Sequence, residues 1–166
     1  MVLVGFAFGL RKNSPGKSNE KMAEIILENN QGEPVIVQGE IAEAFPGEGD
    51  FPLRVIPGNK SEGESYTDTH EVAKRSLEIM ERQDWQGPIT VVCHKAHEPR
   101  IRGVFNKLLP QRGSPERLVR FLKQIQEVPY DFWSLFKGGQ WWTTNPILWW
   151  IREIPARLVY KWKGYI

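Results

Sequence analysis

One stretch constrains the fold of this chain more than any other. It runs from Ile89 to Arg102 and reads ITVVCHKAHEPRIR. The stretch begins as a short β-branched apolar run after Gly87-Pro88, which is typical of a buried strand. Polar residues follow abruptly, and then a second apolar pattern appears at helical spacing, formed by Ile101, Val104, Phe105, Leu108 and Leu109. Open α/β sheets bind ligands where a strand's carboxyl end turns into a helix, so we expect any chemical centre here.

Two further apolar runs predict strands on either side of a helix near the start of the chain. Val2 to Phe8 is a near-continuous apolar run, the pattern of a parallel strand buried on both faces. Ser18 or Asn19 can cap the helix that follows, and Val35-Ile36-Val37 gives the second strand. This β-α-β order predicts a right-handed crossover unit. At 166 residues, the chain is expected to form one three-layer, Rossmann-like α/β domain over residues 1–166, with a mainly parallel sheet.

Caps, prolines and apolar spacing predict the other elements. Asp68 or Thr67 caps a helix that carries Glu71 in its first turn. Asn145 caps a closing helix that is expected to be interrupted at Pro155. The closing helix is predicted over Pro146–Lys163. The other predicted elements are a loop over Glu40–Pro57 with a helical turn at Ile41–Phe45, a short strand at Arg54–Pro57, a helix over Ser114–Leu122 and a strand over Gln124–Tyr130.

Composition and charge exclude several classes of protein. The formal net charge of +2 is too small to indicate nucleic acid as the main partner. The single cysteine, Cys93, excludes an internal disulfide framework and fits a reducing compartment; we expect it to be a buried structural thiol. The apolar start lacks a basic leader and meets Gly9 within a few residues, so it is too short for a signal peptide or a membrane span. A cytoplasmic location is therefore expected.

Polar residues at strand ends and helix starts form the candidate site. Backbone N–H groups at the helix starts near Thr69 and Glu98, together with the Arg100 guanidinium, suit a phosphate or carboxylate. His97 can act as a general acid or base, with Glu71 or Asp68 orienting its imidazole; the alternative is a histidine that caps its own helix and bonds to backbone. The predicted catalytic residues are His97 and Glu71, and the predicted ligand contacts are Gly5, Gly9, Gln38, Gly39, Asp68, Thr69, His94 and Arg100.

Other site chemistries fit the sequence less well. The glycines after the first strand do not have the spacing of a dinucleotide fingerprint, and the chain has neither a serine-hydrolase elbow nor a phosphate-cradling loop with its lysine. The three histidines, His70, His94 and His97, could in principle complete a zinc site. His94 and His97 lie on either side of a strand end, where the two rings need not face the same way. No metal site is predicted.

The last part of the chain is rich in tryptophan. Six of the seven tryptophans fall there: Trp133, Trp141, Trp142, Trp149, Trp150 and Trp162. The segment from Arg157 to Gly164 is both basic and aromatic, a combination that can lie on an anionic membrane surface. A closing helix over 146–166 that packs its tryptophans on or near the sheet is the favoured interpretation, because aromatic stripes mostly fill cores.

The order of these motifs resembles the ElyC/SanA/YdcF family over most of the chain. The resemblance rests on the apolar N-terminal strand, the strand that ends in Gln38-Gly39, the helix start Asp68-Thr69-His70-Glu71, the His97-x-x-Arg100 element and the segment Arg152-Glu153…Ala156…Tyr160. The chain departs from the family pattern at Val72, where asparagine is usual, at Cys93, where threonine is usual, and at Gln38-Gly39-Glu40, where Ser-Gly-Gly or a similar triplet is usual.

The resemblance implies a Rossmann-like domain with a cleft at the strand carboxyl ends. Members of that family are suspected of binding nucleotide-type ligands such as S-adenosylmethionine, and others are linked to envelope or peptidoglycan-precursor metabolism. The predicted function is therefore binding of a phosphate-bearing or nucleotide-like small molecule in that cleft, with His-assisted phosphoester chemistry as an extension. The alternative is a non-enzymatic peripheral module that contacts the membrane, or an envelope-biogenesis partner, through the Trp/Lys-rich C-terminus.

Overall fold

A five-stranded, all-parallel sheet forms the centre of the molecule. The computed structural model describes residues 1–9, 14–47, 50–57, 68–114, 116–132 and 141–166. The strand order is β3-β2-β1-β4-β5, and every neighbouring pair is parallel. This confirms the predicted Rossmann-like α/β class. The strands are β1 (Val2–Gly5), β2 (Val35–Gln38), β3 (Leu53–Ile56), β4 (Ile89–Val92) and β5 (Val119–Phe121).

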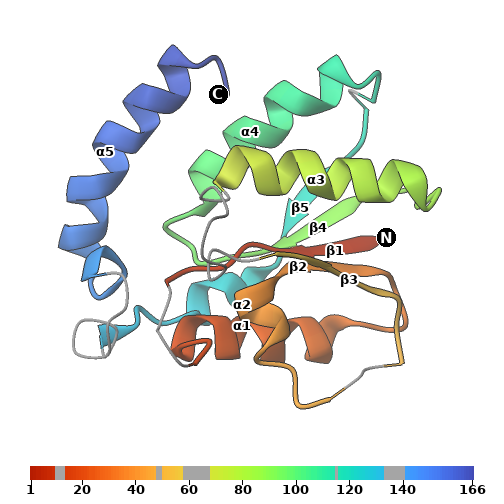
Figure 1. The fold of residues 1–166 in the computed structure, drawn as a ribbon, viewed down its shortest axis with the longest axis horizontal. Helices are drawn as coiled ribbons and strands as arrows, with labels where there is room; N and C mark the ends of the chain where they lie inside the picture. Colours follow the sequence, from red (N-terminus) through yellow and green to blue (C-terminus); the bar gives the residue numbers. More distant parts are fainter. Residues whose placement is uncertain (10–13, 48–49, 58–67, 115, 133–140) are drawn as a thin grey trace.

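Helices cover both faces of this sheet (Figure 1). The helix α1 (Lys17–Asn29), the short helix α2 (Gly39–Ala42) and the 3-10 turn η1 (Lys123–Glu127) lie on one face, and the helices α3 (Thr69–Arg82) and α4 (Glu98–Gln111) lie on the other. Successive side chains of a strand point to opposite faces. Leu3 therefore packs in the core on the α1 side, while Val2 and Val4 pack in the core on the α3–α4 side. Strands β1, β2 and β4 are buried throughout, which explains their continuous apolar runs.

The closing helix α5 (Pro146–Trp162) stands across the carboxyl edge of the sheet rather than on one of its faces (Figure 1). The 3-10 turn η3 (Trp141–Thr143) precedes it. Trp149 of α5 belongs to the core on the α1 side, and Tyr160 belongs to the core on the α3–α4 side. The helix thus joins the two hydrophobic cores at the end of the sheet where ligands bind in folds of this class.

Of the predicted helix caps, those at Asp68 and Asn145 are confirmed. The Asp68 carboxylate accepts a hydrogen bond from the backbone N–H of Glu71 at 2.9 Å, and the Asn145 side chain accepts one from Leu148 at 3.0 Å. The predicted cap of α1 is wrong: Gly16, with a φ of 83°, precedes the helix, and Ser18 and Asn19 lie buried in its first turn. Asn19 instead ties the loop down, since its amide nitrogen donates to the carbonyls of Gly9 and Pro15.

Two predicted elements after α4 are also wrong. The segment predicted as a helix over Ser114–Leu122 contains β5, which pairs with β4 so that Val91 lies opposite Phe121. The segment predicted as a strand over Gln124–Tyr130 contains η1 instead. Pairing with the free edge of β4 satisfies backbone groups on both strands and overrides the local helix-start signal of Ser114-Pro115, whose proline lies outside the described residues.

The predicted interruption of the last helix is wrong as well, because α5 runs through Pro155 without a break. Pro155 is exposed, so water can bond to the backbone carbonyl that loses its helical donor there. No helix in the described parts of the chain is long and apolar enough to cross a membrane.

Candidate functional site

The carboxyl ends of β1 and β4 mark the topological switch point of the sheet. β1 pairs with β2 on one side and with β4 on the other, so the connections leaving β1 and β4 diverge to opposite faces. A crevice at such a point is the usual ligand site of an open parallel sheet. Residues 6–9 follow β1 and residues 93–97 follow β4, and this second segment brings His94 and His97 to the switch point.

His97 lies at the centre of a buried group of polar side chains. Its Nε2 atom lies 2.9 Å from Oγ1 of Thr69 and 2.7 Å from Nη2 of Arg100, and all three residues are at most 6% exposed. A guanidinium can only donate hydrogen bonds, so Nε2 of His97 is the acceptor and the ring proton lies on Nδ1. That Nδ1 atom is buried and has no hydrogen-bond partner among the described residues.

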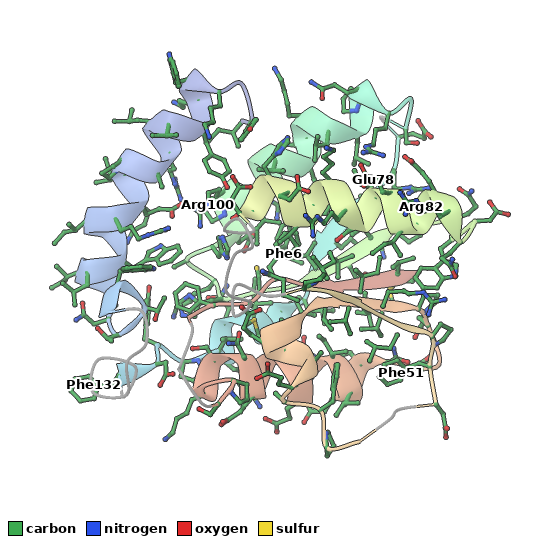
Figure 2. All side chains as sticks on the ribbon, in the orientation of Figure 1. Phe6, Phe51, Glu78, Arg82, Arg100 and Phe132 are labelled. Carbon is green, nitrogen blue, oxygen red and sulfur yellow. The ribbon has the colours of Figure 1, made fainter. Side chains whose placement is uncertain are left out.

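Two residues of α5 extend this group, which we call the carboxyl-edge network: Thr69, His97, Arg100, Glu153 and Arg157. Nη1 of Arg100 lies 3.4 Å from Oε2 of Glu153, and Nε of Arg157 donates to Oε1 of the same carboxylate at 3.0 Å. Arg100 projects from α4 into the space beneath α5 (Figure 2). Two guanidinium groups share one carboxylate, so the network carries one positive charge in excess. Because Glu153 is fully buried and Arg100 nearly so, water screens this charge poorly.

Burial decides the protonation state of the aromatic side chains in the network and beside it. Desolvation, followed by the positive charge of Arg100, holds the pKa of His97 well below its usual range. The imidazole is therefore neutral near pH 7. Burial raises the pKa of Tyr160, whose ring lies 5.4 Å from the Arg100 guanidinium, to about 12. The excess charge of the site thus resides on the two guanidinium groups alone.

His94 belongs to an aromatic cluster beside the network. Its ring stacks on Phe8 with 3.9 Å between centroids and meets Tyr130 edge-on at 4.3 Å. Nδ1 of His94 accepts a hydrogen bond from the backbone N–H of Ala96, while Nε2 has no partner among the described residues. Burial, with a smaller contribution from Lys95, lowers the pKa of His94 to about 3. Two buried ring nitrogens at the switch point, Nδ1 of His97 and Nε2 of His94, thus have no partner within the described parts of the chain.

The structure separates the three histidines by environment. His70 stacks on Tyr165 with 3.8 Å between ring centroids, away from the aromatic cluster around His94. No three histidine, cysteine or carboxylate side chains in the described ranges are grouped in a way that could hold a metal ion.

The predicted contacts at the ends of β1 and β2 have packing roles in the structure. A Cβ atom on Gly5 would come within 2.9 Å of Val37, and one on Gly9, whose φ is 82°, within 2.9 Å of Thr143. Oε1 of Gln38 accepts a hydrogen bond from the backbone N–H of Ala7 at 2.8 Å, which fixes the chain as it leaves β1. Gly39 is the first residue of α2.

The expected orientation of His97 by Glu71 or Asp68 is wrong. Glu71 pairs with Arg75 on the solvent side of α3 at 2.7 Å, and Asp68 caps the same helix. Both carboxylates are used locally, because Asp68 accepts from a free N–H group at the start of α3 and Glu71 pairs with a guanidinium one turn further along the helix. The hydroxyl of Thr69 and the guanidinium of Arg100 hold the ring in their place.

Sequence reasoning did not include Glu153, Trp149 and Tyr160 among the site residues. Trp149 meets the His97 ring at 5.6 Å, and Glu153 neutralises one of the two guanidinium groups. A signal was present: these three positions share one face of the closing helix, and an acid on a face of buried aromatic residues needs a charged partner.

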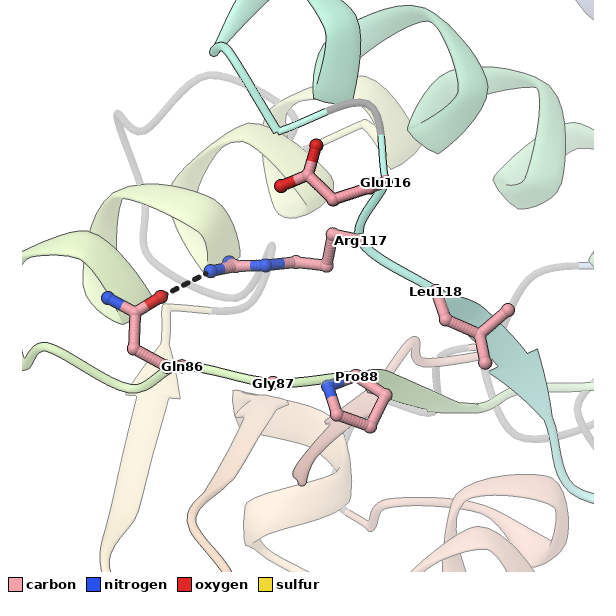
Figure 3. A pocket seen from close by; sticks show the side chains of 6 residues that line it. All are labelled: Gln86, Gly87, Pro88, Glu116, Arg117 and Leu118. Carbon is pink, nitrogen blue, oxygen red and sulfur yellow. Dashed lines mark hydrogen bonds between the residues drawn. The ribbon is translucent and has the colours of Figure 1, made fainter.

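A different hollow, of about 340 Å³, lies at the opposite, amino end of the sheet (Figure 3). Gln86, Gly87, Pro88, Glu116, Arg117 and Leu118 line it, and Arg117 bonds to Gln86 across it at 3.1 Å. Its charged side chains, Glu116 and Arg117, have opposite sign. It contains no buried ionisable group, so it lacks the features that distinguish the carboxyl-edge network.

Comparisons of this chain with models of protein families, with curated proteins and with solved structures give no match, so the site is assigned on its geometry and chemistry alone.

Proposed function

We propose that the chain is a ligand-binding α/β domain that takes an anionic small molecule, of the phosphate-bearing or nucleotide-like class, at the carboxyl-edge network. One observation carries the proposal: a largely buried group at the switch point has one positive charge in excess, and beside that charge the Nδ1–H of His97 has no acceptor among the described residues. A phosphate or carboxylate oxygen would supply the missing negative charge and the missing acceptor together.

The helices around the network add to its preference for anions. Thr69 is the first residue of α3, and His97 directly precedes α4. Both helices therefore direct the partial positive charge of their N-terminal ends towards the switch point. The aromatic rings of Phe8 and Trp149 beside His94 are buried and pack on one another, so they keep this end of the network dry and strengthen its charge interactions. S-adenosylmethionine, which carries both an adenine and a carboxylate, is within this class.

His-assisted phosphoester chemistry would be an extension of this binding function. The lowered pKa of His97 leaves its imidazole neutral near pH 7, so it would serve as a proton acceptor and not as a proton donor of the imidazolium type. Nε2, the basic nitrogen, would first have to release Arg100. Binding without turnover requires no such step and is the core of the proposal.

Membership of the ElyC/SanA/YdcF family is part of the same proposal. Three of the motifs on which the resemblance rests are far apart in the sequence but meet at the carboxyl-edge network: Thr69 contacts His97, Arg100 contacts His97 and Glu153, and the Tyr160 ring lies beside Arg100. Motifs that share one function are expected to converge in this way, and this convergence supports the resemblance.

Thermal-shift and calorimetric titrations with inorganic phosphate, ATP, ADP and S-adenosylmethionine test the proposal. A ligand at 100 times its dissociation constant should stabilise the native state by about 2.7 kcal/mol. We expect the shift to disappear in Arg100→Ala and His97→Ala. Arg102→Ala is the matched control, because Arg102 lies on the same helix but is exposed and pairs with Glu98.

Thr69→Ala provides a milder variant in case the larger truncations lower stability too far for a comparison. It removes the hydroxyl that contacts His97, together with the γ-methyl group. Persistence of the shift in the folded Arg100 and His97 variants would contradict the site assignment. No binding of any of the four compounds to the wild-type chain would contradict the proposed ligand class.

A further inference from the structure

The solvent side of α5 is apolar along its whole length. Five residues form a stripe there, and each is at least 57% exposed: Ile147, Ile151, Ile154, Leu158 and Trp162. Their spacing of three or four residues puts them on one helix face, opposite the buried face of Trp149, Glu153 and Tyr160. A surface helix normally has its polar residues on this outer side. The outer stripe, as we call these five residues, is therefore an unpartnered apolar surface.

The charges that border the outer stripe are all positive. Arg157 and Lys161 lie along one side of it, and Lys163 directly follows the helix. The single acid of α5, Glu153, is buried and paired beneath the helix. An apolar stripe with tryptophan and flanking cations is the pattern of a helix that lies in the interface of an anionic bilayer, where the cations meet lipid phosphates.

A groove between α4 and α5 lies beside this stripe. Its volume is about 290 Å³, and its lining is mostly apolar but includes the side chains of Arg100, Arg157 and Lys161 and no acid. Ile154 and Leu158 of the outer stripe also line it. The start of α4 at Pro99 adds the positive end of a helix. A lipid phosphate with the first part of its acyl chains matches this combination of cations and apolar wall.

Charge distinguishes this occupant from a second copy of the chain. A two-fold contact through the outer stripe would bring the cations of two identical helices together, with no exposed acid on α5 to compensate them. The helix is also placed for a flat surface: it stands at the edge of the molecule (Figure 1), and its 17 residues extend about 25 Å. A bilayer can cover this whole length without touching the sheet.

The geometry points to α5 as a membrane-docking helix: the outer stripe rests on an anionic bilayer, and the groove between α4 and α5 receives a lipid phosphate. This interaction surface goes beyond the proposed function and does not depend on it. It gives the two sides of α5 separate tasks, one inward towards the carboxyl-edge network and one outward towards lipid.

Vesicle flotation of the full chain tests the proposal. Two kinds of vesicle serve as probes. One contains phosphatidylcholine alone, and the other contains phosphatidylcholine with about 30 mol% of the anionic lipid phosphatidylglycerol, which gives the negative surface that attracts basic helices. The wild-type chain should float with the anionic vesicles, at least about ten-fold more strongly than with neutral ones, and should be released by salt. The double variant Ile151→Ser with Leu158→Ser should lose at least about nine-tenths of this binding, as expected when buried apolar area drives it.

Matched controls separate the outer stripe and the groove from general surface effects. Leu118→Ser removes a comparably exposed leucine at the far end of the sheet and should leave flotation unchanged. Lys161→Gln should weaken binding to anionic vesicles, whereas Lys107→Gln on the exposed side of α4 should not. Because Ile151 and Leu158 are both exposed, the double variant should keep the wild-type circular dichroism spectrum.

Three results would overturn the proposal. The first is that the wild-type chain does not float with anionic vesicles. The second is equal binding to neutral and anionic vesicles, which would exclude the role of the cations. The third is a wild-type dimer in solution that Ile151→Ser with Leu158→Ser dissociates, because the stripe would then be an interface between copies. The groove shares Arg100 and Arg157 with the carboxyl-edge network, but it is not lined by His97 or Thr69. Loss of a nucleotide or phosphate shift in His97→Ala or Thr69→Ala with unchanged flotation therefore tells the two proposals apart.

Discussion

Arg100 of α4 and Glu153 of α5 face each other inside the molecule, with 3.4 Å between Nη1 and Oε2. They come from helices that share few other contacts, and both side chains are almost completely buried. The pair connects the helix that carries His97 to the helix that covers the strand ends. It therefore links the stability of the edge of the domain to the chemistry of the candidate site.

Replacing Glu153 with glutamine should destabilise the fold by about 3 kcal/mol, because removing one partner of a buried ion pair leaves the other charge uncompensated. Urea unfolding monitored by tryptophan fluorescence measures the change. Glu98→Gln is the control: it breaks the exposed pair with Arg102 and should cost about 1 kcal/mol or less. The double variant Arg100→Met with Glu153→Leu should be more stable than Glu153→Gln; a less stable double variant would contradict this account.

Stability should fall as the pH drops below about 6.5, the ordinary pKa of histidine. The folded pKa of His94 is about 3 and that of His97 is also lowered, so below pH 6.5 the unfolded chain binds protons that the folded chain excludes. Each histidine then removes about 1.4 kcal/mol of unfolding free energy per pH unit, and above pH 6.5 this dependence disappears. Urea titrations at pH 7.5, 6.5 and 5.5 measure it.

The variant His94→Asn isolates one of these contributions. It retains an acceptor for the backbone N–H of Ala96 but cannot titrate. We expect the loss of stability between pH 6.5 and 5.5 to be smaller than in the wild-type chain by about 1 kcal/mol. An unchanged slope would mean that His94 binds its proton in the folded state.

Cys93 should not react with thiol reagents while the chain is folded. Its side chain is completely buried, and burial raises the pKa of its thiol well above the ordinary value. Both factors suppress the thiolate that such reagents attack. Ellman's reagent should therefore label the native chain at the rate of global or local opening and the urea-unfolded chain at once. Rapid labelling of the native chain would show that the end of β4 is accessible.

Gly5→Ala should destabilise the chain by about 1–3 kcal/mol through overpacking. An added Cβ would lie 2.9 Å from Val37 of β2 and 3.0 Å from Ile41 of α2, so these side chains would have to move away from β1. Gly47→Ala is the control, because nothing lies within 4 Å of its added Cβ. Thermal unfolding of the two variants side by side gives the comparison, and equal midpoints would contradict the packing role of Gly5.

Much of the fold could be predicted because it follows from local patterns. Strands buried on both faces need continuous apolar runs, and Asp68 and Asn145 mark helix starts because a free N–H group attracts their side chains. The stretch around β5 could not be predicted in the same way. It has only three residues, too few for a clear alternating pattern, and pairing with the open edge of β4 makes them a strand.

The candidate site could be predicted only in part for a related reason. Thr69, His97 and Arg100 were placed on one rim because parallel strands end at the same edge of a sheet, and the structure brings all three together. The face of α5 that carries Glu153 indicates a buried acid with a charged partner, but only the fold shows that Arg100, on a helix far away in the sequence, is one of its two partners. Gly5, Gly9 and Gln38 have the residue types of ligand contacts, but they serve close packing and a loop hydrogen bond, which a sequence pattern cannot distinguish from binding.

The central position of β1 has a consequence for how this chain folds. Leu3 can pair with Val35 as soon as α1 and β2 have been made, but its other neighbour, Thr90, becomes available only when the chain has been made past α3. During synthesis the first crossover unit, β1-α1-β2, therefore exists for a time with one side of β1 unpaired. Non-local pairing of this kind slows folding and leaves an apolar edge open to other chains. We expect refolding yield to depend on protein concentration more steeply than for a domain with only local contacts.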